Sequence, residues 1–295
     1  MTLKGLFTAI VTPFNEKLEL DQKKLRQIIR LQIESGVNGI VPLGTTGESP
    51  TLSAKEKETI IKISVEEAKG KTPVIVGTGT YSTQETIENT HVAAQLGANM
   101  ALIVSPYYNK PTQEGLYRHF MTIADKASIP FIIYNIPGRT AQNIQLETLK
   151  KLATHPKIVG LKESTGNITL IGEVLETIAR VTPNFSVLSG DDVLTFPLMS
   201  LGGHGVISVV SNLIPREIKQ LVDSLLQMDY ETARNLHFQL APLFRAAFLE
   251  TNPIPIKTAM NMCGLAVGPC RLPLCEMTNE NSKALLSTLK SLKLC

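Results

Sequence analysis

The sequence is poor in cysteine and contains no tryptophan. Its four cysteines all lie in the last 33 residues, and they form neither a C-x-x-C pair nor a set with neighbouring histidines. A disulfide-rich scaffold is therefore excluded, and the spacing does not favour a zinc site. We expect free thiols in a reducing cytoplasm, rather than zinc ligands or disulfides, at Cys263, Cys270, Cys275 and Cys295.

Blocks of like charge are also missing. The 29 basic and 26 acidic side chains give a net charge of +3 spread along the chain, which is not the electrostatic footprint of a protein that binds nucleic acid or acidic membranes. The amino-terminal segment lacks the cleavage pattern of a signal peptide. An uncharged stretch at 193–215 is long enough to cross a bilayer, but its proline and glycines indicate buried segments of a globular fold. Small molecules are the expected partners.

Motifs of several enzyme classes are absent. The chain has no G-x-x-x-x-G-K-[ST], and Gly77-Thr-Gly79 is followed by Ser82 where a dinucleotide-binding loop needs a third glycine. Neither G-x-S-x-G nor H-E-x-x-H occurs, so serine-hydrolase and zincin mechanisms have no support. Asp191 and Asp192 lack further ligands at metal-binding spacing. We expect a loop that leads into a helix there, and no metal site.

What the sequence does contain is a regular alternation of short apolar runs and longer amphipathic segments. Its 295 residues, 43% of them hydrophobic, suffice for a large core. Eight rounds can be counted, with strands expected at 8–11, 39–43, 73–76, 101–105, 131–134, 158–162, 186–188 and 205–209. Strands joined by crossover helices pair in parallel, and eight such units predict an α/β fold, the (β/α)8 TIM barrel. A doubly wound open sheet is the main alternative, and the missing nucleotide-binding loop argues against it.

Helix signals accompany this pattern. Apolar residues at helical spacing between 25 and 33 predict the first helix. Two pairs predict capping boxes, Ser53 with Glu56 and Ser82 with Glu85. After residue 228 the strand signal stops, while 230–249 and 283–294 have helical patterns. We therefore expect a catalytic barrel at 1–228 and a small C-terminal helical appendage at 229–295.

A lysine at the end of an apolar strand is the first chemical signal. In the segment Ile158-Val-Gly-Leu-Lys162-Glu, strand alternation places Ile158, Gly160 and Lys162 on one face. If that face points into the barrel, the glycine leaves space beneath the lysine stem, and burial lowers the lysine pKa from about 10.4. A neutral amine can attack a ketone to form a Schiff base. The alternative is a strand-end lysine whose ammonium reaches water.

The adjacent strand offers groups that would support a catalytic lysine. The segment at 131–140 brings Tyr134 and Arg139 to the same end of the barrel. The phenol can donate to and accept from a carbinolamine oxygen, unless it is simply a half-buried aromatic with its hydroxyl satisfied, and the guanidinium suits a carboxylate. The turn at 44–48 has glycines and hydroxyls that can face an anion, and the loop at 105–111 carries two adjacent tyrosines, which cannot both be core.

Five segments occur in order along the chain: Gly44-Thr-Thr-Gly-Glu48, Tyr134-Asn-Ile-Pro-Gly-Arg139-Thr, Gly160-Leu-Lys162-Glu, Ser189-Gly-Asp-Asp192 and Asn252-Pro-Ile-Pro-Ile-Lys257. With them the sequence resembles the dihydrodipicolinate synthase family of pyruvate-dependent class I aldolases and lyases over essentially its whole length. The resemblance implies the same barrel. It also implies the condensation of pyruvate with L-aspartate-4-semialdehyde to 4-hydroxy-tetrahydrodipicolinate, the first committed step of diaminopimelate and lysine biosynthesis, without metal or organic cofactor.

Carried over by position, the resemblance also implies roles for single residues. Lys162 would form the Schiff base with pyruvate, Tyr134 would shuttle protons, and Thr45 and Tyr108 would complete a proton relay. In the family that second tyrosine comes from a neighbouring subunit, which implies a homo-oligomer, usually a tetramer built as a dimer of dimers. The substrate-binding residues implied are Thr46, Gly190 and the backbone of Ile207 for pyruvate, and Arg139 for the carboxylate of aspartate-4-semialdehyde.

Two alternatives and one departure accompany the resemblance. Sister enzymes of the N-acetylneuraminate lyase and 2-keto-3-deoxy sugar acid aldolase types share the lysine and tyrosine, but Arg139 and the doubled threonine favour the synthase. A catalytically silent barrel is disfavoured because all of these groups are present. In members inhibited by lysine, the effector binds at positions matching Pro50, Ala54, Lys57, Tyr81, Glu85 and Tyr107. The charge of Lys57 would repel a cationic effector, so we predict weak or absent feedback inhibition.

Overall fold

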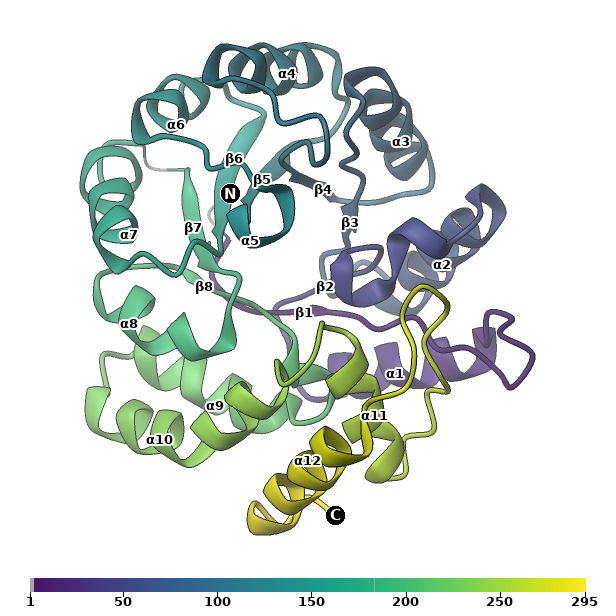
Figure 1. Ribbon diagram of the computed structural model, residues 1–295. Coiled ribbons are helices and arrows are strands. Elements are labelled where there is room, and N and C mark those ends of the chain that lie inside the picture. Colours follow the sequence, from purple (N-terminus) through teal and green to yellow (C-terminus); the bar gives the residue numbers. More distant parts are fainter. Residues whose placement is uncertain (1–2, 183) are drawn as a thin grey trace.

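The computed structural model describes residues 3–182 and 184–295. Within these residues eight strands form one parallel sheet in the order β2-β1-β8-β7-β6-β5-β4-β3, and a parallel bridge between Ile40 and Val74 joins its two ends into a barrel (Figure 1). The strands are β1 Gly5–Ala9, β2 Gly39–Val41, β3 Ile75–Gly77, β4 Met100–Val104, β5 Phe131–Asn135, β6 Ile158–Glu163, β7 Ser186–Ser189 and β8 Gly205–Ser208. The predicted TIM barrel is confirmed, with strand ends shifted by a few residues.

Helices surround the barrel on its outside (Figure 1). They are α1 Gln22–Glu34, α2 Ala54–Ala68, α3 Thr83–Gln95, α4 Gln113–Lys126, α6 Leu146–Leu152, α7 Ile168–Val174, α8 Thr195–Ser200 and α9 Pro215–Leu226. The short helix α5 Pro137–Thr140 lies inside this ring, over the end of the barrel (Figure 1). Helix α1 buries Leu25, Ile28 and Ile29, as the apolar spacing predicted. The capping box of Ser53 and Glu56 is present at the start of α2. Only half of the second capping box is present: the Ser82 hydroxyl accepts from the Glu85 amide as predicted, but the Glu85 carboxylate accepts from the Thr80 hydroxyl rather than from the Ser82 amide.

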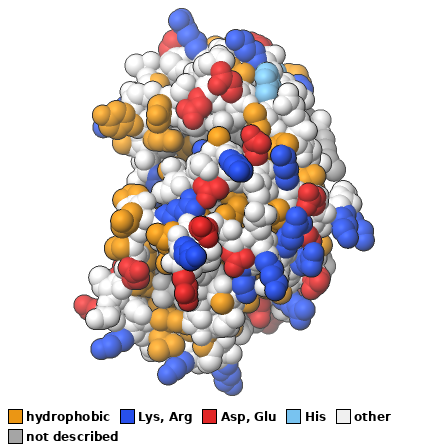
Figure 2. Space-filling model, turned by 90° about the vertical axis from the view of Figure 1, so that its right-hand side faces the viewer, with side chains coloured by type: hydrophobic (Ala, Val, Ile, Leu, Met, Phe, Trp, Pro, Cys, Tyr) orange, Lys and Arg blue, Asp and Glu red, His pale blue; other side chains and the backbone are white. Residues whose placement is uncertain are grey.

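Three further helices follow the barrel: α10 Tyr230–Ala246, α11 Ile254–Met262 and α12 Asn279–Ser291. The predicted segments 230–249 and 283–294 correspond to α10 and α12, whereas α11 was not expected. The stretch 193–215 contains α8 and β8 rather than one long helix. None of the helices in the described residues is long and apolar enough to span a membrane. Charged side chains of both signs are interspersed on the face turned toward the viewer in Figure 2, as expected from the absence of like-charge blocks.

The barrel interior is filled by a separate apolar cluster. Its buried members include Phe7, Val41, Ile132, Leu188 and Ile207, while their neighbours along each strand pack outward against the helices. This alternation is what a closed parallel barrel requires. It places one face of every strand, including that of Lys162, toward the barrel axis.

An irregularity in β6 corrects one prediction. The register between β5 and β6 shifts near Phe131 and Ile132, so Val159 packs against the interior cluster and Ile158 packs outward. Ile158 therefore does not share the face of Lys162. Gly160 is also not what accommodates the lysine stem, because a Cβ there would lie 2.5 Å from the Ser186 carbonyl oxygen of β7. The glycine is needed for close strand pairing.

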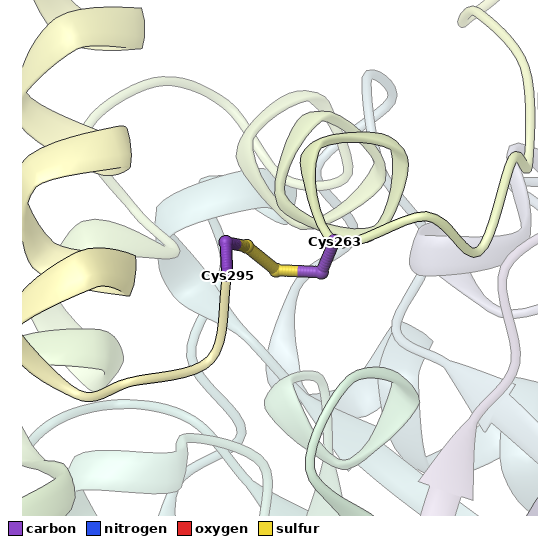
Figure 3. The surroundings of a disulfide bond; sticks show 2 residues. All are labelled: Cys263 and Cys295. Carbon is purple, nitrogen blue, oxygen red and sulfur yellow. A yellow bond between two sulfur atoms is a disulfide. The ribbon is translucent and has the colours of Figure 1, made fainter.

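The C-terminal cysteines correct another prediction. Cys263 and Cys295 form a disulfide across a sequence separation of 32 residues (Figure 3). The two meet because α12 packs against α11, which brings the end of the chain back to the residue that caps α11. The prediction of free thiols rested on the absence of a C-x-x-C pair, and that absence says nothing about cysteines that the packing of two helices brings together. Cys270 and Cys275 are free, as expected.

Candidate active site

Lys162 and Tyr134 face each other at the carboxyl ends of two adjacent strands. They are register partners on β6 and β5, and the Lys162 Nζ atom lies 4.1 Å from the centroid of the Tyr134 ring. Both side chains are buried, at 6% exposure each. The strand-end lysine that reaches water is therefore not what the structure contains.

Burial changes the proton affinity of both groups. It lowers the pKa of Lys162 from its ordinary value to about 7, against the opposing effect of the Asp192 carboxylate and with a smaller contribution from the Arg139 guanidinium. Burial raises the pKa of Tyr134 to about 12. At neutral pH a substantial fraction of the amine is therefore uncharged while the phenol keeps its proton. Such a pair has the chemistry that a nucleophile and a proton donor require.

Gly190 makes room for the lysine stem. A Cβ at this position would lie 2.8 Å from the Lys162 Cε atom and would also collide with the Ser164 hydroxyl. Position 190 therefore excludes any side chain, since real Cβ atoms do not approach other atoms so closely. The sequence prediction assigned Gly190 to the pyruvate site, and the structure places it directly against the predicted nucleophile.

A cavity of about 560 Å³ opens at this end of the barrel. Its wall includes Thr45, Tyr134 and Arg139, together with Asn252 just before α11. Thr45 lies on the short 3-10 turn Thr45–Gly47 that follows β2, and Arg139 lies on α5. Three predicted residues are buried and do not belong to the wall: Lys162, Thr46 and Ile207.

Thr46 and Arg139 are linked through one residue that sequence reasoning did not single out. Asn252 donates from its side-chain amide to the Thr46 hydroxyl oxygen at 3.0 Å, and its backbone carbonyl accepts from Arg139 at 3.2 Å. A hydroxyl that accepts in this way keeps its own hydrogen for another acceptor. The Asn252 motif contributed to the family resemblance, but nothing in its spacing indicated these contacts.

The two adjacent tyrosines have different surroundings. Tyr107 is half-buried, lines the cavity, and packs edge-to-face against Tyr81 with ring centroids 5.5 Å apart. Tyr108 is 92% exposed, and its backbone has φ +72°. A left-handed conformation is unusual for a tyrosine. Of the four predicted catalytic residues, Lys162 and Tyr108 are both absent from the cavity wall, and Tyr108 is the one that is exposed.

The cavity also reaches the predicted effector positions. Pro50, Lys57, Tyr81, Glu85 and Tyr107 belong to the same wall as Thr45, whereas Ala54 does not. The Lys57 side chain thus borders the space next to Tyr81 and Glu85, where the sequence argument placed it.

The Asp191 and Asp192 pair forms a loop, as expected, but with a role the sequence did not reveal. Asp191 caps a short 3-10 turn by accepting from the Val193 amide. Asp192 is buried and accepts from the Val209 and Val210 amides, at 2.9 and 3.1 Å, just beyond β8. Its charge favours the protonated form of Lys162. In the described part of the chain, no group of three or more histidine, cysteine and acidic side chains is arranged to hold a metal ion.

Comparison with known proteins finds a matching family model, similar sequences and similar solved structures. A model of the dihydrodipicolinate synthetase family matches residues 2–292. The chain is 52% identical over 292 residues to the 4-hydroxy-tetrahydrodipicolinate synthase of Protochlamydia amoebophila, covering 99% of this chain and 97% of that one. It is 48% identical to that of Geotalea daltonii, covering 99% of each chain. The crystal structure of the Aquifex aeolicus dihydrodipicolinate synthase has 47% identity and a TM-score of 0.95, covering 99% and 98%. That from Thermotoga maritima has 42% identity and a TM-score of 0.97, covering 100% of each.

Proposed function

The chain belongs to the dihydrodipicolinate synthetase family, and from this premise we propose how its residues carry out the family's reaction. The reaction is the condensation of pyruvate with L-aspartate-4-semialdehyde to 4-hydroxy-tetrahydrodipicolinate in lysine and diaminopimelate biosynthesis. The observation that carries the residue assignment is the buried amine of Lys162 against the ring of Tyr134.

In the first stage, the neutral Nζ of Lys162 adds to the pyruvate carbonyl carbon. Tyr134 gives a proton to the resulting alkoxide, and loss of water leaves an iminium ion. Thr46 and the backbone of Ile207 hold the pyruvate carboxylate, with Gly190 nearby. The Thr46 hydroxyl suits this role because it accepts from Asn252 and so has its hydrogen free for the carboxylate.

In the second stage, the iminium ion makes the pyruvate methyl group acidic, and loss of one methyl proton gives an enamine. The enamine carbon attacks the aldehyde carbon of aspartate-4-semialdehyde, and the new alkoxide takes a proton through Tyr134 and Thr45. Arg139 receives the carboxylate of this substrate at the cavity wall. The amino group of the adduct then attacks the iminium carbon, which closes the ring and releases Lys162.

The proposal includes a second subunit. Tyr108 is exposed in this chain, and we propose that it completes the relay with Tyr134 and Thr45 of a neighbouring subunit. Three apolar side chains, Ile168, Leu201 and Phe238, are exposed at 41%, 51% and 67% on or beside α7, α8 and α10, and α8 contacts both α7 and α10. We propose that these helices pair two such dimers into a tetramer.

The assignment also covers location and organisation. A cytoplasmic location suits a biosynthetic enzyme whose substrates are central metabolites. We further propose that residues 229–295 form a helical appendage to the catalytic barrel of residues 1–228.

The test is to trap the Schiff base. The protein is incubated with pyruvate and borohydride, the adduct is mapped by mass spectrometry, and turnover with aspartate-4-semialdehyde is measured in the same preparation. A reduced pyruvyl group on Lys162 together with turnover is expected, and Lys162→Arg should show neither. An adduct without turnover would indicate a sister aldolase with another aldehyde. No adduct on the wild-type protein would refute the mechanism.

A further inference from the structure

The turn that carries Thr45 and Thr46 ends in an unusual glutamate. Glu48 follows the turn with φ +52°, a left-handed conformation that favours glycine. Holding a residue with a Cβ in this region is energetically unfavourable. Such strain persists where surrounding contacts compensate for it, and the side chain of Glu48 makes such contacts.

The Glu48 carboxylate is fully buried and fully partnered. Its Oε1 atom accepts from the Lys257 Nζ atom at 2.7 Å, and the two side chains are 0% and 2% exposed. Its Oε2 atom accepts from the Arg271 backbone amide at 2.9 Å. Both oxygens are therefore used within the chain, and neither is available to a substrate.

Lys257 is equally occupied. Besides Glu48, its Nζ atom donates to the Thr12 carbonyl at 3.0 Å and the Pro269 carbonyl at 2.6 Å. An ammonium group has three hydrogens to donate, so each has an acceptor. A buried ammonium satisfied in this way is not a nucleophile or a proton carrier, and its role lies in what it connects.

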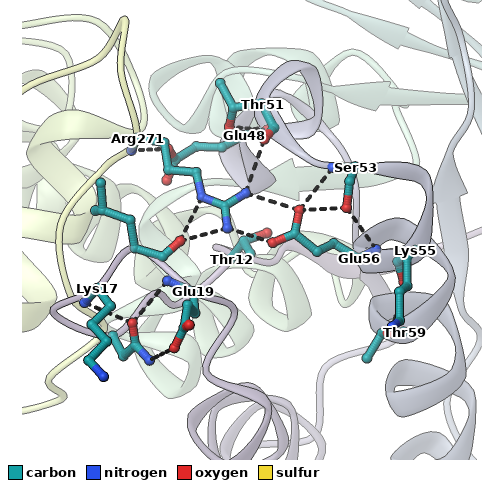
Figure 4. Close-up of polar contacts among 12 residues, drawn as sticks. Thr12, Lys17, Glu19, Glu48, Thr51, Ser53, Lys55, Glu56, Thr59 and Arg271 are labelled. Carbon is teal, nitrogen blue, oxygen red and sulfur yellow. Dashed lines mark hydrogen bonds and ion pairs between the residues drawn. The ribbon is translucent and has the colours of Figure 1, made fainter.

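This ion pair joins the turn Thr45–Gly47 and the following Glu48 to the C-terminal region, as does the hydrogen bond from the Arg271 amide to Glu48 (Figure 4). Thr12, whose carbonyl binds Lys257, also donates its hydroxyl to the Gly47 carbonyl at 2.6 Å, so the turn is held from both sides. A second contact comes from just before α11, where the Asn252 amide donates to the Thr46 hydroxyl. The start of α11 therefore contacts the turn at two points, through Asn252 and Lys257.

We propose that Glu48 and Lys257 are positioning residues for the condensation. Their buried ion pair fixes the turn so that the hydroxyls of Thr45 and Thr46 keep their places opposite Tyr134 and the bound pyruvate. The inference rests on the roles assigned above to these two threonines. According to this proposal, the C-terminal region supplies no reacting group but affects catalysis by holding the turn of Thr45 and Thr46 in place.

The experiment distinguishes the contacts of the Glu48 side chain from the effect of the left-handed backbone conformation of Glu48. Glu48→Gly relieves the left-handed conformation, and combining it with Lys257→Met avoids leaving an unpaired buried ammonium. The matched control is Glu56→Gln, which breaks the ion pair of Glu56 with Arg271 at 2.5 Å without touching the turn. We measure kcat, KM for pyruvate and the melting temperature of each variant.

The double variant should lose roughly tenfold or more in kcat and raise the KM for pyruvate, since a misplacement of about 1 Å in a catalytic group can cost about a hundredfold. Glu56→Gln should lower the melting temperature and leave kcat and KM unchanged. Kinetic constants of the double variant within twofold of wild type would overturn the proposal, as would equal loss of kcat in the control.

A second variant covers the case in which the double variant does not fold. Glu48→Gln keeps an acceptor for Lys257 but turns an amide toward the Arg271 N–H, so it should lower kcat over KM for pyruvate by roughly threefold or more in a folded protein. An unchanged value would refute the positioning role. Failure of the underlying function is recognised separately, because the wild-type protein would then form no pyruvate adduct.

Discussion

Burial of Lys162 predicts how fast the protein forms its pyruvate adduct at each pH. With a pKa of about 7, about half of the amine is neutral at pH 7, whereas an ordinary lysine would be neutral in about one molecule in 3,000. The difference from the ordinary value of 10.5 corresponds to roughly 5 kcal/mol by which the fold disfavours the charged amine. Burial is its largest cause, and the side chain is 6% exposed.

The assay is the rate of borohydride-trapped adduct formation at saturating borohydride across a pH series. The rate should rise about tenfold per pH unit below about pH 7 and level off above about pH 8, since only the neutral amine attacks. A rate that still rises tenfold per unit between about pH 8 and 10 would refute the reasoning, because it would mean that Lys162 titrates like a lysine in water.

Two variants check the electrostatic part of the argument by moving the midpoint in opposite directions. The Asp192 carboxylate raises the pKa of Lys162 and the Arg139 guanidinium lowers it. Asp192→Asn should therefore shift the midpoint to lower pH, and Arg139→Met should shift it to higher pH. Shifts of the same sign, or none, would contradict the assigned causes.

The lowered pKa of Lys162 also predicts how the stability of the protein changes with pH. Between about 7 and 10.5 the unfolded chain binds a proton at Lys162 that the folded chain does not, so the free energy of unfolding rises with pH in this window. Relative to Lys162→Met, the wild-type protein should gain roughly 2 kcal/mol between about pH 7 and 9, measured by urea denaturation. Parallel pH profiles for the two proteins would contradict the assignment.

Four further outcomes are expected. Arg139→Met should raise the KM for aspartate-4-semialdehyde roughly tenfold or more by removing a charge-assisted hydrogen bond, and steady-state kinetics with an unchanged KM would contradict its role. Tyr108→Ala should lower kcat and weaken the dimer, which sedimentation velocity would detect; full activity in an intact dimer would exclude it from the relay. L-Lysine should not inhibit at submillimolar concentration because of the Lys57 charge, and a submillimolar inhibition constant would refute this. Replacing Cys263 and Cys295 by serine should lower the free energy of unfolding by at most about 4 kcal/mol for a closed loop of this length. Thiol titration of the unfolded wild-type chain should find two free cysteines before reduction and four after it.

The sequence was sufficient to predict the features that repeat or that end a strand. Eight apolar runs at crossover spacing predicted the barrel, because each run must be buried on both faces in a parallel sheet. Strand alternation predicted the burial of Lys162 only on the condition that its face points into the barrel, and the structure meets that condition. Residues at the same height on adjacent strands, such as Tyr134, could be placed beside it by topology alone.

Features that depend on a local exception were not predictable in this way. The register shift in β6 breaks the alternation at Ile158 and Val159. The two-residue periodicity of a strand cannot predict such an irregularity. Glu85 was assigned to a capping box because its spacing fitted, but the nearby Thr80 hydroxyl competes for the same carboxylate. Periodicity predicts the face on which a side chain lies. The register shift and the hydrogen bond of Glu85 depend instead on the local contacts of individual residues.

Long-range contacts of the C-terminal region are another kind of feature that the sequence did not predict. Glu48 and Lys257 are 209 residues apart in sequence, and neither the turn nor α11 carries a pattern that points to the other. The sequence predicted a glycine-threonine turn whose hydroxyls can face an anion, and it gave no role to the glutamate that ends the turn, whose carboxylate holds the turn in place. Because Asn252, Lys257 and the Arg271 amide all reach this turn from one segment, sequence changes between 252 and 271 should alter catalysis. They should do so through the position of the threonine hydroxyls, while the amine of Lys162 keeps its place on β6 and its ability to form the pyruvate adduct.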